Sequence, residues 1–200
     1  MKKIASIAFM SLAILATSCK KDKKEDNNAE DKVEATTSED NSSNISEAAK
    51  EEKVTFKLSP KSGSKASGSV VFKENDGKVT FTAVIGGLAE GTHAIHIHES
   101  ADCSSEDGKS TGGHWNPTGK PHGKWGDAGG YHKGDIGNFE ADENGNGTIT
   151  MTTDEWCIGC DDASKNVLGK AIIVHQGVDD FTSQPSGDAG ARISCGGIIQ

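Results

Sequence analysis

Side chains that commonly bind metal ions concentrate in the second half of this 200-residue chain. His96 and His98 stand two residues apart on a predicted strand, so both imidazoles face the same side, about 7 Å apart. One such pair is a weak signal, and two ordinary strand histidines are the alternative to a metal site. Five further candidate metal ligands follow, a larger number than would be expected by chance in one small domain. They are His114, His122, His132, Asp135 and His175.

The types of these side chains indicate two different ions. Imidazole suits copper and zinc, and an all-nitrogen set suits a copper ion that cycles between two oxidation states. Three histidines with one carboxylate suit a closed, four-coordinate zinc site without redox chemistry. Seven ligands for two four-coordinate ions leave one ligand to be shared. An imidazolate can be that ligand because it has two nitrogens.

Short strands must position these ligands, since no stretch of the chain shows the apolar stripe of an amphipathic helix. Alternation of apolar and polar residues predicts strands over 54–58, 69–72, 79–85, 93–98 and 148–152, and a short apolar run predicts a buried strand over 171–174. Asn75-Asp76-Gly77 is a strong hairpin signal between two of them. Seven or eight such strands in about 150 residues predict an antiparallel sandwich or barrel.

One long segment, residues 99–138, has no strand pattern and is rich in Gly, Ser, Asp, Lys and His. Irregular loops of that length are usually either functional or disordered. Four of the candidate ligands lie inside this segment, which favours a functional loop.

The composition narrows the class of protein further. Asp and Glu number 30 against 21 Lys and Arg, which gives a formal net charge of −9. Binding to nucleic acid or to an anionic membrane surface usually depends on a basic patch, so the charge argues against both partners. The 25 glycines and only 4 prolines favour a turn-rich fold over a helical one.

Residues 1–18 resemble the export signal of a bacterial lipoprotein. Lys2 and Lys3 precede an apolar segment, residues 4–15, which is too short to span a bilayer. Small residues then lead to Cys19, where we expect a lipid as the only membrane attachment of a cell-envelope or periplasmic protein. A short transmembrane helix, or cleavage that leaves Cys19 as a free thiol, is the alternative.

The expected domain organisation follows from the same region. Residues 19–52 hold scarcely a large apolar side chain and cannot bury enough surface to offset the entropy of ordering. We therefore expect a disordered tether there, followed by one folded domain over 53–200.

The folded part resembles the copper/zinc superoxide dismutase family. The resemblance runs in the family's order through GTHAIHIHE (91–99), GHWNP (113–117), HG (122–123), HKGDIGN (132–138), VH (174–175), DD (179–180) and GARISCG (190–196). It implies an all-β, eight-stranded antiparallel Greek-key barrel or sandwich, immunoglobulin-like, with long metal-binding and electrostatic loops. It also implies copper bound by His96, His98, His114 and His175, and zinc bound by His114, His122, His132 and Asp135.

The same resemblance implies roles in a reaction. The family disproportionates superoxide, a small anion, into dioxygen and hydrogen peroxide. By matching positions, Arg192 would bind the anion, and His114 would bridge the metals and deliver a proton. Asp179 would hydrogen-bond ligands of both metals, and His93 would be a histidine that binds neither. Arg192 is the only arginine in the chain.

The five cysteines fit the family in part. The resemblance pairs Cys103 with Cys195 in a disulfide. Cys157 and Cys160 are additional, and we expect a local disulfide or an unpaired structural pair. A zinc knuckle would need a second ligand pair, and a redox motif would need a thioredoxin-like context.

Two features leave alternatives open. The segment 179–192 contains no lysine, although the family steers its substrate partly with lysines there. Lys120, Lys124 and Lys133 in the other loop are the candidates to replace them.

The rival functions are a non-catalytic copper- or zinc-binding envelope protein and a purely structural surface lipoprotein. The sequence does not specify an oligomeric state.

Overall fold

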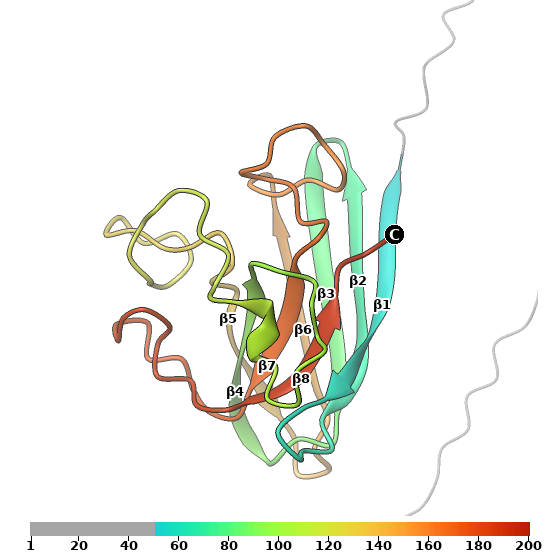
Figure 1. Ribbon diagram of the computed structural model, residues 1–200, viewed down its shortest axis with the longest axis vertical. Coiled ribbons are helices and arrows are strands. Elements are labelled where there is room, and N and C mark those ends of the chain that lie inside the picture. Colours follow the sequence, from blue (N-terminus) through green and yellow to red (C-terminus); the bar gives the residue numbers. More distant parts are fainter. Residues whose placement is uncertain (1–50) are drawn as a thin grey trace, which may run out of the picture. The chain divides into compact units, whose positions relative to one another are not determined.

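The computed structural model describes residues 51–200, so the expected export signal, Cys19 and all but the last two residues of the expected tether lie outside the described part. Eight strands and one short 3₁₀ helix, η1 (Lys109–Thr111), form within it (Figure 1). The strands are β1 (Glu52–Pro60), β2 (Ser67–Asn75), β3 (Lys78–Gly86), β4 (Gly91–His98), β5 (Gly137–Ala141), β6 (Gly147–Thr153), β7 (Ala171–His175) and β8 (Arg192–Gly197). No helix among these residues is long and apolar enough to cross a membrane.

The strands close into a barrel in the order β1-β2-β3-β6-β5-β4-β7-β8. Every neighbouring pair is antiparallel. Strands β4, β5 and β6 are consecutive antiparallel neighbours, while β3 lies beside β6, which is the Greek-key arrangement. The predicted all-β, eight-stranded antiparallel barrel is therefore confirmed.

Local sequence explains where the strands begin and end. Asp76 and Gly77 have φ values of 50° and 70°, so both adopt the left-handed conformation that a tight two-residue hairpin turn requires. All six segments expected to be strands lie within strands of the barrel. The two strands that these sequence patterns do not reveal are β5 and β8, in which glycine and small polar residues interrupt the apolar pattern.

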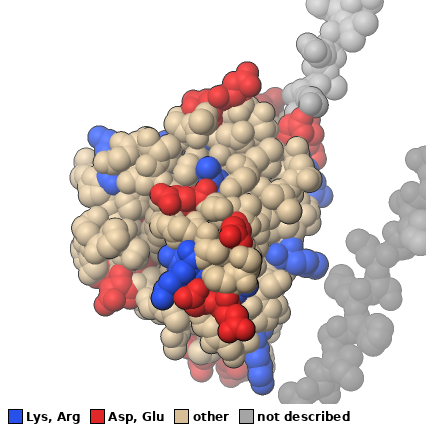
Figure 2. Space-filling model, viewed as in Figure 1, with Lys and Arg blue, Asp and Glu red and all other residues tan. Residues whose placement is uncertain are grey.

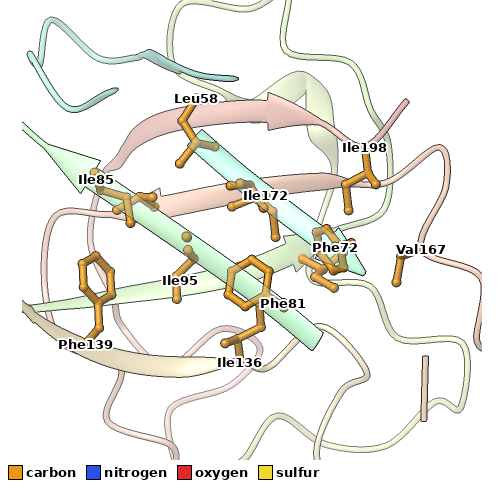
Figure 3. Close-up of a cluster of buried hydrophobic side chains, with 14 of the residues drawn as sticks. Leu58, Phe72, Phe81, Ile85, Ile95, Ile136, Phe139, Val167, Ile172 and Ile198 are labelled. Carbon is orange, nitrogen blue, oxygen red and sulfur yellow. The ribbon is translucent and has the colours of Figure 1, made fainter. Parts of the chain in front are cut away.

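The barrel interior is filled by alternate side chains of its strands (Figure 3). Phe72 and Phe81 are register partners on β2 and β3, and their ring centroids lie 5.1 Å apart. Trp156, from the connection between β6 and β7, packs against both rings and is fully buried. Burial of these three aromatic side chains stabilises the barrel by several kcal/mol, at roughly 25 cal/mol per Å² of apolar surface.

Strand β4 separates two environments. Ile95 and Ile97 belong to the hydrophobic core, whereas His96 and His98 alternate with them and point to the opposite face. That face is also buried, with both histidines 0% exposed. Backbone hydrogen bonds from Ile97 to Gly134 and from Ala94 to Gly177 attach the two long connections, before β5 and after β7, to this strand. These connections cover the outer side of the barrel (Figure 1).

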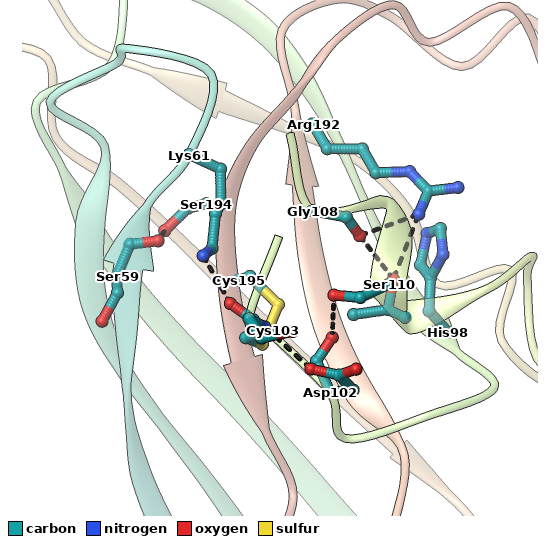
Figure 4. Close-up of a disulfide and its surroundings, with 12 residues drawn as sticks. Ser59, Lys61, His98, Asp102, Cys103, Gly108, Ser110, Arg192, Ser194 and Cys195 are labelled. Carbon is teal, nitrogen blue, oxygen red and sulfur yellow. Dashed lines mark hydrogen bonds between the residues drawn. A yellow bond between two sulfur atoms is a disulfide. The ribbon is translucent and has the colours of Figure 1, made fainter. Parts of the chain in front are cut away.

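The described residues hold two disulfides, and one of them fastens a loop to the barrel. Cys103 and Cys195 are 92 residues apart in sequence and join the long connection after β4 to β8 (Figure 4). Closing a loop of that length stabilises the fold by about 4 kcal/mol in the chain-entropy model. Cys157 and Cys160 form a local disulfide with a separation of only 3 residues, within the connection between β6 and β7.

Candidate metal centre

Four buried imidazoles converge on the outer side of β4 and β7. Their candidate donor atoms all lie within 4.8 Å of one another, and the residues are His96, His98, His114 and His175. His96 and His98 come from β4, and His175 is the last residue of β7. His114 comes from the long connection and is placed by an isolated antiparallel bridge to His98. The four ligands expected for copper are thus brought together.

One nitrogen of each imidazole in this cluster has no hydrogen-bond partner. These buried atoms are His96 Nδ1, His98 Nε2, His114 Nε2 and His175 Nε2. A buried polar atom without a hydrogen-bond partner lowers the stability of a fold by about 1–3 kcal/mol. Four such atoms close together are therefore not expected unless a ligand binds to them. A cation that accepts nitrogen lone pairs satisfies all four, and the all-imidazole donor set is one that copper favours.

A second buried cluster shares a residue with the first. It consists of His114, His122, His132 and Asp135. The carboxylate lies at its centre, with Asp135 oxygens 2.8 Å from His114 Nδ1, 3.0 Å from His122 Nδ1 and 3.2 Å from His132 Nδ1. Three histidines and one carboxylate are a donor set typical of a closed zinc site.

His114 belongs to both clusters through different atoms. Its Nδ1 faces Asp135 in the second cluster, and its Nε2 is the unpartnered atom in the first. The ring centroids of His114 and His96 lie 4.1 Å apart, and the His114 ring is nearly perpendicular to the ring of His132. The geometry therefore suits one imidazole held between two ions.

Asp179 connects the two clusters from behind. Its Oδ2 accepts a hydrogen bond from His96 Nε2, and its Oδ1 accepts one from His122 Nε2, each 2.9 Å long. These bonds use the ring nitrogens that face away from the clusters, which fixes the tautomer and orientation of both rings. This is the position that the resemblance implies for Asp179, but the resemblance identifies no residue that holds Asp179 in place.

Asn138 holds Asp179 in place. It accepts a hydrogen bond from the Asp179 amide and donates one to the Asp179 carbonyl, both 2.8 Å long. The Phe181 amide adds a third bond, to Asp179 Oδ1. In the sequence, Asn138 is only the last residue of the HKGDIGN segment. Its two hydrogen bonds to the Asp179 backbone join residues 41 positions apart, so no local sequence pattern indicates them.

The electrostatics of the clusters depend on burial and on the carboxylates. Burial lowers the pKa of His98 and His175 well below the usual range, and it lowers that of His114 to about 4. At His122 the effect of burial is outweighed by the carboxylates of Asp135 and Asp179, which lie beside its two ring nitrogens and raise its pKa to about 9. The first cluster thus holds neutral imidazoles, the form that binds metal.

His93 takes no part in either cluster. It lies on β4, and its two ring nitrogens are each 2.9 Å from a backbone carbonyl oxygen, those of His175 and Ala89. Its ring packs beside Phe139 with a centroid distance of 6.1 Å. These contacts fit the packing and hydrogen-bonding role expected from the resemblance.

A small pocket opens over the first cluster. It measures about 240 Å³ and is lined by His98, His114, His175, Ser186, Asp188, Ala189, Gly190 and Arg192. Arg192 Nη1 donates hydrogen bonds of 2.9 Å to the Gly108 carbonyl and 3.1 Å to Thr111 Oγ1. Figure 4 shows the guanidinium extending toward the His98 ring. The only arginine of the chain therefore stands beside the imidazole cluster.

No lysine among the described residues lines this pocket. Lys133 pairs with Glu155, and both line a different pocket together with Lys120. Acidic and basic side chains alternate over one face of the molecule, without a patch of one sign (Figure 2). The lysines proposed as replacements for the missing ones are thus not placed at the mouth of the pocket.

Comparison with known proteins agrees with this geometry. Residues 66–198 match the family model described as copper/zinc superoxide dismutase (SODC). Copper–zinc superoxide dismutase 2 of Brassica juncea is 35% identical over 136 residues, which are 64% of this chain and 86% of that protein.

Solved structures with the same fold include a SOD-like protein from Bacillus subtilis, with 31% identity and a TM-score of 0.65 over 72% of this chain and 97% of that one. The clock protein EA4 is similar at 33% identity and a TM-score of 0.63, covering 74% and 94% of the two chains. The chain belongs to the copper/zinc superoxide dismutase family, and its two clusters correspond to the copper and zinc sites of that family.

Close packing at Gly134 predicts the effect of one substitution on the second cluster. A Cβ there would lie 2.2 Å from the Ile97 carbonyl oxygen, and the same glycine exchanges backbone hydrogen bonds with Ile97 and Trp115. Gly134→Ala should push the neighbouring Asp135 out of place and weaken zinc binding by roughly tenfold. Competition with a chelator, together with urea unfolding, would measure both zinc affinity and stability.

Gly129→Ala is the matched control, because a Cβ at Gly129 in the same connection meets no atom within 4 Å. Equal zinc affinities for the two variants would contradict the role assigned to the close approach at Gly134.

Proposed function

We propose that this protein is a superoxide dismutase with a redox-active copper and a structural zinc. The observation that carries the proposal is the pair of buried clusters that share His114, beside a pocket that contains Arg192. Membership of the family supports it. The rival function, a metal carrier without catalysis, requires the clusters but not an anion-binding arginine beside them.

Each residue has a chemical task in this proposal. Bound copper would supply the one-electron chemistry that turns two superoxide ions into dioxygen and hydrogen peroxide. Arg192 would attract the anion and orient it, because a guanidinium stays charged and donates in a fixed fork. His114 would hold or deliver a proton at Nε2, the nitrogen that faces the pocket cluster. Asp179 would keep His96 and His122 in the orientation that both ions need.

Metal content and superoxide consumption together test the proposal. We expect one copper and one zinc per chain in the loaded protein, with dismutation that is lost when a chelator removes copper. Both ions bound without turnover would support the carrier and contradict the enzyme. Neither ion bound would contradict both functions.

Replacement of Arg192 tests the anion site. Arg192→Ile should lower kcat/KM for superoxide by roughly tenfold at low ionic strength, as expected for the loss of a fixed charge at the point of capture. Both metals should remain bound, because Arg192 is not a candidate ligand. Arg192→Lys keeps the charge without the fork and should recover part of the rate.

Because Arg192 also bonds Gly108 and Thr111, unfolding of each variant must be compared with the parent. Unchanged turnover in a stable, fully loaded Arg192→Ile protein would refute the role.

We further propose that the protein is exported and anchored to a bacterial membrane by a lipid on Cys19. The charged start, the short apolar segment and the small residues before the cysteine support this proposal. Cells that express the chain should incorporate labelled palmitate into it, and Cys19→Ala should abolish the label and release the protein from membranes. Labelling that survives Cys19→Ala would contradict the anchor.

A further inference from the structure

An acidic side chain stands in the wall of the pocket that holds Arg192. Asp188 lines this pocket together with Arg192 and the candidate copper ligands His98, His114 and His175. It is exposed, and no hydrogen bond or ion pair to another described residue involves its carboxylate. A residue in the wall of the pocket in which an anion would bind thus carries a negative charge that pairs with no other described residue.

We propose that Asp188 sets the anion selectivity of this pocket by repelling anions in proportion to their charge. The inference rests on the proposed function of the same pocket, which binds a small monoanion beside Arg192. Asp188 lowers the affinity for a monoanion moderately and lowers the affinity for a dianion, such as sulfate or hydrogen phosphate, much more. It thereby keeps multiply charged anions away from the imidazole cluster.

The effect of the Asp188 carboxylate on anion binding depends on the other charges around the pocket. Arg192 is the one cation in the lining, and no lysine occurs between residues 179 and 192. Asp107 lies close enough to act on the Arg192 guanidinium electrostatically. The side chains of the wall thus hold one positive and one negative charge, so beyond the charge of bound metal ions they add no net positive charge that would concentrate dianions.

The dependence on ligand charge follows from Coulomb's law. The repulsion energy is proportional to the charge of the anion, so the factor lost by a monoanion is squared for a dianion. A unit charge several ångströms away in a hydrated site changes monoanion affinity by about two- to threefold, and dianion affinity by about four- to ninefold. Salt screens both effects, and at about 1 M the Debye length is only about 3 Å.

The backbone at this position allows a clean test. Asp188 has a φ of 50°, in the left-handed region that asparagine tolerates as well as aspartate does. Asp188→Asn therefore removes the charge and keeps both shape and backbone. Glu143→Gln is the matched control, because it removes the same net charge at a position outside the pocket. Glu143 is exposed in the turn between β5 and β6.

The experiment measures anion binding to the copper- and zinc-loaded protein. Azide, a monoanion, is titrated by its change in the visible spectrum of the copper site, and sulfate is titrated by competition with azide. Asp188→Asn should bind azide about two- to threefold more tightly and sulfate about four- to ninefold more tightly than the parent. Both ratios should approach one at about 1 M salt. Glu143→Gln should match the parent.

Turnover provides a second comparison. Asp188→Asn should raise kcat/KM for superoxide at low ionic strength by a factor similar to that for azide. It should also make the enzyme more sensitive to inhibition by sulfate.

Equal azide and sulfate affinities in Asp188→Asn and Glu143→Gln would overturn the inference, as would equal gains for the monoanion and the dianion. A loaded protein that binds azide but does not dismutate superoxide would overturn the proposed function, while the affinity ratios would still decide the role of Asp188. Failure to take up copper would overturn both.

Discussion

The carboxylate of Asp179 holds together parts of the chain that lie far apart. One oxygen binds His96 on β4 and the other binds His122 in the long connection, 57 residues away from Asp179 in sequence. Through these two bonds a rigid strand, a long irregular loop and the segment after β7 share one fixed point. Asp179 and the shared His114 therefore fix the separation between the two candidate metal clusters, and Asn138 fastens Asp179 to β5.

Much of this arrangement could be predicted from residue types and spacing. The alternation around His96 and His98 indicates a strand with two imidazoles on one face, and the hairpin at Asp76-Gly77 follows from the conformational preferences of those residues. The resemblance to the family supplied the ligand sets. The computed structure brings both sets together as buried clusters.

Other parts could not be predicted, for physical reasons. Strand β8 contains Arg192, Ser194 and two glycines, so its apolar alternation is too weak to recognise, and its place is set by pairing with β7 and β1. The close approach of Gly134 to Ile97 depends on a contact between segments distant in sequence. Similarly, nothing local shows that Lys133 pairs with Glu155 and lines a pocket other than the one that holds Arg192.

The two faces of β4 have a consequence for the history of such a protein. Ile95 and Ile97 serve the hydrophobic core, while His96 and His98 serve the outer side, so the two sets of side chains change independently. A substitution that removes His96 or His98 therefore creates no cavity in the hydrophobic interior of the barrel. The barrel can therefore remain folded after its metal sites are lost. Descendants of an enzyme with this architecture can keep the fold and acquire a different function.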